Sequence, residues 1–225
     1  VDDAMSEELV ASMVAVSYAL HGQALPRDHR LALAVALERL VPWLADAAQA
    51  GLHRINTVAG GGDARRVPEE LPSARAGAIA LLSQRARLAL RVRRERLAEL
   101  APLAGAWLDV GGHTLRLGDA PLVRELLPYG TLYAHLVASS NDDDELAFLA
   151  AVEHELDSLG VACRPICGRR QIFDLDGAML TGFSLMLDGL SPAGSLRVLE
   201  SGLGRHRRLG CGIFVPHKSA AALRA

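Results

Sequence analysis

A glycine-rich basic loop near the end of the chain has the residue types needed to bind a polyanion. Residues 201–215 read Ser-Gly-Leu-Gly-Arg-His-Arg-Arg-Leu-Gly-Cys-Gly-Ile-Phe-Val, so two Gly-apolar-Gly triplets enclose a basic run. Glycine permits positive φ and a close backbone approach, and successive amides can form a concave anion nest. Arginine adds planar guanidinium groups that match phosphate geometry. We predict that phosphates bind Gly202, Leu203, Gly204, Arg205, His206, Arg207, Arg208, Gly210, Cys211 and Gly212.

The context of this loop excludes two commoner glycine motifs. A predicted helix over 191–199 precedes it and a predicted strand over 212–215 follows it. A dinucleotide-binding fingerprint has the reverse order, strand before helix, and a Walker loop ends in Gly-Lys-Ser/Thr rather than Gly-Cys-Gly. A plain helix-to-strand turn with solvated arginines is the alternative, although an ordinary turn needs only one or two glycines.

The spacing Gly-apolar-Gly, five residues, Gly-apolar-Gly resembles the signature loop of the CRISPR repeat-processing endoribonucleases. These are RAMP-type proteins that cut precursor CRISPR RNA, and Gly202, Gly204, Gly210 and Gly212 match their pattern without a gap. The resemblance implies two ferredoxin-like domains with the loop facing the cleft between them. It also implies binding of repeat RNA and metal-independent cleavage that leaves a cyclic phosphate. The catalytic histidine would lie in the N-terminal domain, on or just after the first helix.

Two histidines are candidates for the catalytic base. Metal-free RNA cleavage needs a base for the 2′-hydroxyl proton, an acid for the leaving 5′-oxygen, and donors that stabilise the phosphorane-like charge. His29 follows Asp28, the predicted N-cap of a helix whose positive end attracts phosphate and favours a neutral imidazole. His53 lies where the next strand is predicted to start. Solvated surface histidines are the alternative for both.

The remaining histidines are weaker candidates. His21 lies in a predicted turn, and His206 is expected to contact phosphate rather than act as the base. His135 alternates into a predicted strand and is expected in the core, and three others are expected to be structural, on the surface or in the tail: His113, His154 and His217.

A second RNA contact is predicted at Arg169 and Arg170, which we expect in a turn of the second half. Further arginines cluster in residues 85–96 and could flank an RNA stem. Only 4% of the residues are aromatic, so backbone and groove contacts should dominate over base stacking.

The predicted elements that position these residues form a β-α-β-β-α-β order twice. In the first half we predict strands over 13–20, 52–59 and 86–92, helices over 28–50 and 94–103, and a final hairpin of 106–110 and 113–117. In the second half we predict strands over 131–138, 162–166, 171–175, 178–187 and 212–215. The predicted helices are one that is capped by Asn141 or Asp142 and ends at 159, and one over 191–199. Residues 60–73 are predicted as a loop and 119–130 as a linker or an extra edge strand. The fold class is therefore α+β, with two ferredoxin-like (RRM-like) domains over 1–120 and 121–225.

Composition limits the other functional classes. With 225 residues, 50% of them hydrophobic, the chain can form two globular cores. No apolar run reaches the length of a membrane span and no signal peptide is recognised, so we expect a cytoplasmic protein without a membrane partner. The three cysteines, Cys163, Cys167 and Cys211, form neither a disulfide framework nor a metal-ligand pattern. We therefore expect no metal and no cofactor. The net charge of −2 conceals clustered arginines that can form a basic face.

Three functions remain in competition. The first is an endoribonuclease that binds CRISPR repeat RNA, the precursor or the mature form, either alone or with other Cas subunits of an effector complex. The second is a non-catalytic RAMP subunit that binds guide RNA through the same loop. The third is a small-molecule-binding ferredoxin-like enzyme, for which the sequence contains no cofactor signature.

Overall fold

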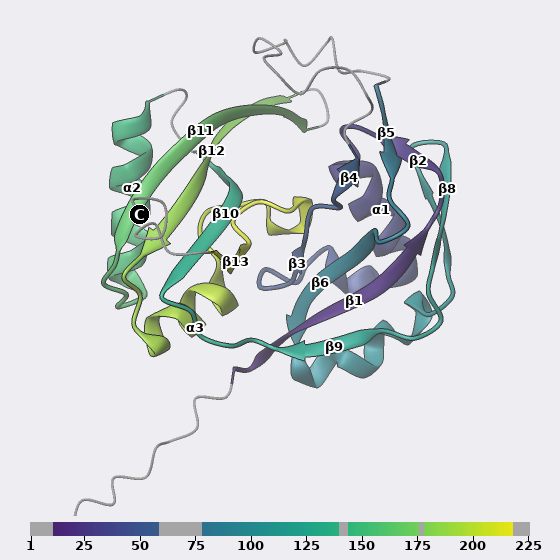
Figure 1. Cartoon of the computed structure of the whole chain (residues 1–225), viewed down its shortest axis with the longest axis horizontal. Coiled ribbons are helices and arrows are strands. Elements are labelled where there is room, and N and C mark those ends of the chain that lie inside the picture. Colours follow the sequence, from purple (N-terminus) through teal and green to yellow (C-terminus); the bar gives the residue numbers. More distant parts are fainter. Residues whose placement is uncertain (1–10, 59–77, 140–143, 176–177, 218–225) are drawn as a thin grey trace, which may run out of the picture.

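The computed structural model describes residues 11–58, 78–139, 144–175 and 178–217, which form two large β-sheets side by side and a smaller third sheet (Figure 1). The predicted loop over 60–73 and the predicted caps Asn141 and Asp142 lie outside the described residues. The glycine-rich loop, yellow in Figure 1, lies between the two halves next to β3.

The first sheet has the strand order β3-β6-β1-β8-β7, with β1 at its centre. Its strands are β1 (Met13–His21), β3 (Gly51–Leu52), β6 (Arg87–Arg93), β7 (Trp107–Val110), β8 (His113–Leu117) and β9 (Leu122–Glu125). One edge of β1 pairs antiparallel with β6, and β8 and β9 also pair antiparallel with β1. The extra edge strand predicted within 119–130 is therefore present as β9.

The first helix is shorter than the sequence pattern predicts, and the second is a 3₁₀-helix. Helix α1 (Arg30–Leu40) ends ten residues before the predicted end at 50, because Pro42 disfavours a helical conformation at Val41 and starts the 3₁₀-helix η1 (Pro42–Leu44). The predicted cap Asp28 is wrong, because His29 occupies the N-cap position. The predicted helix over 94–103 forms the 3₁₀-helix η3 (Arg94–Leu103), which contains Pro102.

A third, small sheet replaces part of the predicted second strand. It consists of β2 (Ala24–Pro26), β5 (Ile79–Leu82) and β4 (Thr57–Val58), in the order β2-β5-β4. The strand predicted over 52–59 is thus two short pieces, because β3 pairs with β6 and β4 pairs with β5. The residues between them, 53–56, are irregular and include His53.

The second sheet has the strand order β11-β12-β10-β13. Its elements are β10 (Thr131–Ala138), α2 (Glu145–Ser158), β11 (Arg164–Leu175), β12 (Ala178–Asp188), α3 (Pro192–Ser201), the 3₁₀-helix η4 (Arg207–Leu209) and β13 (Phe214–Pro216). The two short strands predicted over 162–175 are a single irregular strand, β11. The N-cap of α2 is Asp144, whose carboxylate accepts from two backbone amides, and Ser191 caps α3 as predicted.

Both large sheets share one strand order. The four strands of the β-α-β-β-α-β unit are, in chain order, β1, β3, β6 and β8 in the first half and β10, β11, β12 and β13 in the second. In both sheets the second strand pairs with the third, the third with the first, and the first with the fourth; β7 and β9 are additions to the first sheet. The prediction of two tandem ferredoxin-like units is therefore confirmed. Each half has its own apolar cluster, but Leu209 of the loop belongs to the first cluster and Met13 of β1 to the second. No helix among the described residues is long and apolar enough to cross a membrane.

Candidate nucleic-acid interface and active site

The glycine-rich loop has a strained backbone path that explains its composition. All four signature glycines have positive φ, and so does His206, at +63°. The amides of all four signature glycines already have protein acceptors. Gly204 N donates to a carboxylate oxygen of Glu155 on α2 at 2.8 Å, and Gly212 N donates to Leu136 O at 2.7 Å. One amide of the predicted anion nest thus already binds a carboxylate of the protein itself.

Two buried arginines stabilise the carboxyl end of α3, just before the loop. Arg91 of β6 is 3% exposed and donates to Leu199 O at 2.7 Å and to Phe214 O at 2.9 Å. Arg207 is 7% exposed and donates to Glu200 O at 3.1 Å. The last carbonyls of a helix have no partner inside it and form the negative end of its dipole, so both cations are well placed. Burial lowers the pKa of each guanidinium to about 10.

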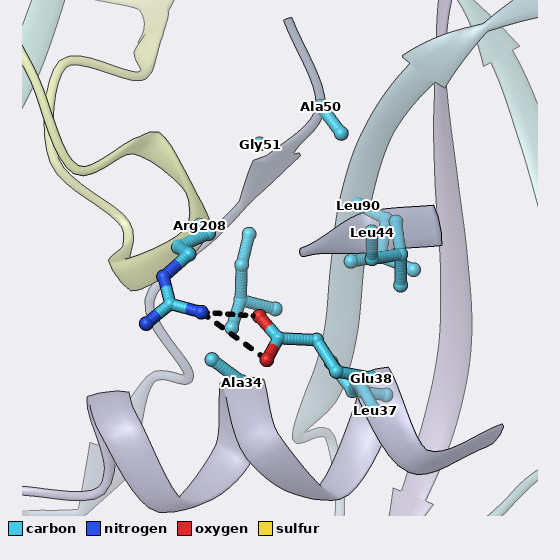
Figure 2. Close-up of a pocket in the computed structure, with 9 residues that line it drawn as sticks. Ala34, Leu37, Glu38, Leu44, Ala50, Gly51, Leu90 and Arg208 are labelled. Atoms are coloured by element: carbon cyan, nitrogen blue, oxygen red, sulfur yellow. Dashed lines mark hydrogen bonds and ion pairs between the residues drawn. The ribbon is translucent and has the colours of Figure 1, made fainter. Parts of the chain in front are cut away.

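The other basic residues of the loop differ in their accessibility. Arg205 is exposed, while His206 is half-buried. Figure 2 shows Arg208 reaching from the loop to Glu38 on α1, with Nη1 2.9 Å and 3.2 Å from the two carboxylate oxygens. This ion pair closes over a small apolar pocket that α1 and β3 line together with Arg208.

Two further contacts fix the loop to the N-terminal half. Leu209 is 2% exposed and packs into the first core. The guanidinium of Arg30, at the start of α1, donates to Leu209 O at 2.9 Å. The loop therefore joins the two halves, and the residues that RNA can reach without rearrangement are a subset of those predicted.

His29 is held in one tautomer beside this contact. Its Nδ1 lies 3.0 Å from Pro26 O. A carbonyl can only accept, so Nδ1 has the proton and Nε2 has the lone pair. Burial lowers the pKa of His29, and the guanidinium groups of Arg30 and Arg54 lower it further against the bond to Pro26 O. His29 is thus neutral at physiological pH, although it is only 5% exposed in this state.

His135 lies on the face of the second sheet opposite the helices, which corrects its predicted place in the core. The side chain is half-exposed, and its Nε2 is 2.8 Å from Arg54 Nη1. Guanidinium only donates, so Nε2 of His135 is the acceptor. Burial, with Arg54 and Arg30, lowers the pKa of His135 to about 4. The prediction placed His135 on the wrong face: buried and partly exposed residues alternate along β10 through His135, which shares a face with Tyr133, whereas Leu132 and Ala134 lie on the buried face.

His53 lies near the two buried arginines, Arg91 and Arg207. Its Nε2 is buried and has no hydrogen-bond partner among the described residues. Burial, then Arg91 and Arg207, lower its pKa to about 3. His53 is therefore a neutral interface residue here, and its predicted role as a base stays a prediction.

Arg169 and Arg170 lie in a strand, which corrects the predicted turn. They belong to an irregular part of β11 between Cys167 and Arg170, and Arg169 is exposed. β12 separates them from β10 and His135. Their predicted contact with RNA stays a prediction.

The structure thus brings His29, Arg30, Arg54, His135 and Gly210 together where the two halves meet. A Cβ at Gly210 would lie 3.2 Å from Arg30 Nη1 and 3.7 Å from Arg54 N, which shows how closely the loop approaches both arginines. Arg30 and Arg54 are not among the site residues predicted from the sequence. Their adjacency in sequence to His29 and His53 was the available signal. Among the described residues, no group of three or more His, Cys, Asp or Glu side chains could hold a metal ion.

Comparison with known proteins gives consistent matches. A family model described as Cas6 Crispr matches residues 14–219. The CRISPR-associated endonuclease Cas6 of Myxococcus xanthus (strain DK1622) is 36% identical over 208 residues, which cover 92% of this chain and 83% of that protein.

Solved structures show the same fold at low identity. A CRISPR associated protein Cas6 aligns over 92% of this chain and 100% of its own, with TM-score 0.60 and 10% identity. A Cas6-related protein from Pyrococcus furiosus aligns over 90% and 98%, with TM-score 0.55 and 12% identity. A RAMP protein described as binding different RNA substrates has the same coverage, TM-score and identity as the Pyrococcus protein.

Proposed function

From the premise that this chain belongs to the Cas6 family, we propose that it is an endoribonuclease that cleaves CRISPR repeat RNA without a metal ion. Its Myxococcus relative is named a CRISPR-associated endonuclease, and a RAMP protein of the same fold is described as binding RNA. The observation in this chain that carries the proposal is His29, whose Nδ1 bonds to Pro26 O so that Nε2 has the lone pair, and which lies near Arg30 and Arg54.

The proposed reaction uses the 2′-hydroxyl of the nucleotide before the cut. His29 Nε2 takes the hydroxyl proton, and the 2′-oxygen attacks the adjacent phosphorus. The bond to the 5′-oxygen breaks, an acid gives that oxygen a proton, and the upstream product keeps a 2′,3′-cyclic phosphate. His29 is favoured over His53 as the base because the cations near it are Arg30 and Arg54 of the junction, whereas the cations near His53 are the buried Arg91 and Arg207.

RNA would lie across the junction of two domains, residues 1–120 with the base and residues 121–225 with the glycine-rich loop. Exposed Arg205 is the side chain of the loop best placed to meet phosphate, and Arg169 would give a more distant contact. The protein would act in the cytoplasm and could stay with its product among the other Cas subunits of an effector complex.

The test is incubation of the purified protein with labelled repeat RNA from its own locus in excess EDTA. We expect a cut at one position, and no cut when that nucleotide carries 2′-deoxyribose. His29→Ala should lower the single-turnover rate by about 10²–10⁴-fold, the usual contribution of a general base. His154→Ala, on the exposed surface of α2, is the matched control and should cleave at the wild-type rate.

Other outcomes have distinct meanings. Cleavage that survives His29→Ala but is lost in His53→Ala would move the base to His53. Tight binding of repeat RNA by the wild type without cleavage would make the protein a guide-RNA-binding subunit and overturn the nuclease proposal.

A further inference from the structure

We propose that Arg54 is a catalytic residue that stabilises the negative charge on the scissile phosphate, and that His135 is the positioning residue that holds it. This inference rests on the proposed nuclease function. It concerns two residues from different halves of the molecule, Arg54 from the segment after β3 and His135 from β10.

The contact between them has a defined direction. Arg54 Nη1 donates to His135 Nε2 at 2.8 Å, and a guanidinium has five N–H donors, so the contact leaves most of them for another acceptor. Among the described residues, no carboxylate pairs with Arg54. An exposed arginine that is anchored by a neutral base, rather than by an acid, keeps its full charge for an anionic ligand.

His135 is itself held firmly. Gln171 Nε2 of β11 donates to His135 O at 2.6 Å, and β10 pairs in regular register with β12 up to Ala134, the residue before His135. Tyr133 lies two residues before His135 on β10 and has the same intermediate burial. The sheet therefore fixes the backbone on which the His135 imidazole is mounted.

Arg54 also lies close to the proposed base. Burial lowers the pKa of Arg54, and the positive charges of Arg30 and Arg27 lower it further. The Arg54 charge in turn lowers the pKa of His29. These like charges gather at the junction without a paired carboxylate from the described residues, which is the arrangement expected around a phosphate.

In the reaction Arg54 neither takes nor gives a proton. As the 2′-oxygen bonds to phosphorus and the 5′-oxygen leaves, negative charge grows on the non-bridging oxygens. Donors placed in advance at that position stabilise the transition state more than the ground state. Because the donor and its support come from opposite halves, cleavage would depend on the docking of the two halves.

The first experiment compares single-turnover cleavage by the wild type and by Arg54→Gln. Loss of one such donor should slow cleavage by about 10²–10³-fold, while the Kd for uncleaved 2′-deoxy repeat RNA should rise by no more than about tenfold, as for one phosphate contact. Arg116→Gln removes a guanidinium from β8 in the same way and should leave both values unchanged.

A phosphorothioate substrate tests direct contact. Replacement of one non-bridging oxygen of the scissile phosphate by sulfur gives two stereoisomers, and the wild type should cleave one of them more slowly than the other. This difference between the stereoisomers should vanish in Arg54→Gln. A residue that supports only the fold would leave the sulfur effect as it is in the wild type.

The role of His135 is tested by a pair of variants. His135→Gln keeps an acceptor for Arg54 and should retain most of the rate, whereas His135→Leu should lose nearly as much as Arg54→Gln. Two results would overturn this inference alone. One is an equal cleavage rate for His135→Gln and His135→Leu, and the other is a wild-type rate for Arg54→Gln when His29→Ala is inactive. A wild type that does not cleave would overturn the nuclease function and this inference together.

Discussion

Leu203 and Gly212 face each other across the base of the glycine-rich loop. Leu203 N donates to Gly212 O at 3.2 Å, and a Cβ at Gly212 would lie 1.8 Å from Leu203 O. The two Gly-apolar-Gly triplets are thus paired with each other, and no side chain fits between them. The signature spacing of this loop is a requirement of its own closure before it is a requirement of any ligand.

Gly212→Ala should therefore destabilise the fold strongly. Gly212 has φ +65°, and the clash is with backbone, so we expect a loss of roughly 3–5 kcal/mol in the free energy of unfolding, measured by urea denaturation. Gly112→Ala separates the two causes, because Gly112 has φ +82° but no atom within 4 Å of its Cβ position. That control should lose only about 1–2 kcal/mol. Equal losses in both variants would show that the close approach of Leu203 contributes nothing.

Arg205→Ala should weaken RNA binding without affecting stability. Arg205 is the exposed arginine of the loop that has no ion pair among the described residues. We expect a several-fold rise in Kd and a fall of about one in the slope of log Kd against log salt, as for the loss of one phosphate contact. Binding should be measured with non-cleavable RNA at several salt concentrations.

Arg207→Met is the contrasting variant. Arg207 is buried against Glu200 O, so its loss should lower the free energy of unfolding by roughly 2–4 kcal/mol and leave the salt slope unchanged. If Arg207→Met lowered the slope of log Kd against log salt and Arg205→Ala left it unchanged, the loop would have to open when RNA binds.

Element order was predictable from the sequence because strands and helices here have clear hydrophobic patterns and strong end signals. The strand over 131–138 and the Ser191-Pro192 helix start are examples, and the family resemblance based on the loop is confirmed. The predicted ends of elements were wrong where a proline ended a helix, as at Pro42. They were also wrong where a predicted strand divides between two sheets, as at β3 and β4.

The arrangement of the site was less predictable, because it depends on contacts between residues far apart in sequence. The sequence does not show that the face of β10 with Tyr133 and His135 lies at the junction rather than in a core, because that depends on how the two halves pack. The loop arginines look alike in sequence, yet Arg207 is buried at a helix end and Arg208 is paired with Glu38. Only the packing of the two halves distinguishes them.

Leu209→Ala should loosen the attachment of the loop to the N-terminal half. Leu209 is 2% exposed in the first core, so we expect a loss of about 2–5 kcal/mol in the free energy of unfolding. Because Arg30 donates to Leu209 O, hydrogen exchange should also accelerate at the amides of η4. Leu209→Met conserves volume and is the matched control, with a loss below about 1.5 kcal/mol. A small loss in Leu209→Ala would mean that the loop is not a structural joint.

The stability of the protein should fall as the pH falls from 7 to 5. The pKa of His53 is about 3 in the folded protein, against 6.5 for the ordinary residue, so between these values the unfolded chain binds a proton that the folded chain does not. The contribution of His53 is therefore complete above pH 6.5 and decreases by about 1.4 kcal/mol per pH unit below it. His29 and His135 have lowered pKa values and contribute with the same sign.

His53→Phe tests this assignment, because it keeps a ring and removes the buried Nε2 that has no partner among the described residues. Urea denaturation at pH 5, 6 and 7 should give a free energy of unfolding that falls less steeply with falling pH than in the wild type. The difference in slope should correspond to nearly one bound proton, or about 1.4 kcal/mol per pH unit. The range stays above pH 5 because depressed carboxyl groups such as Asp188 lose their contribution at lower pH. An unchanged slope in His53→Phe would mean that the proton enters elsewhere, and would remove the reason for treating His53 as a neutral interface residue.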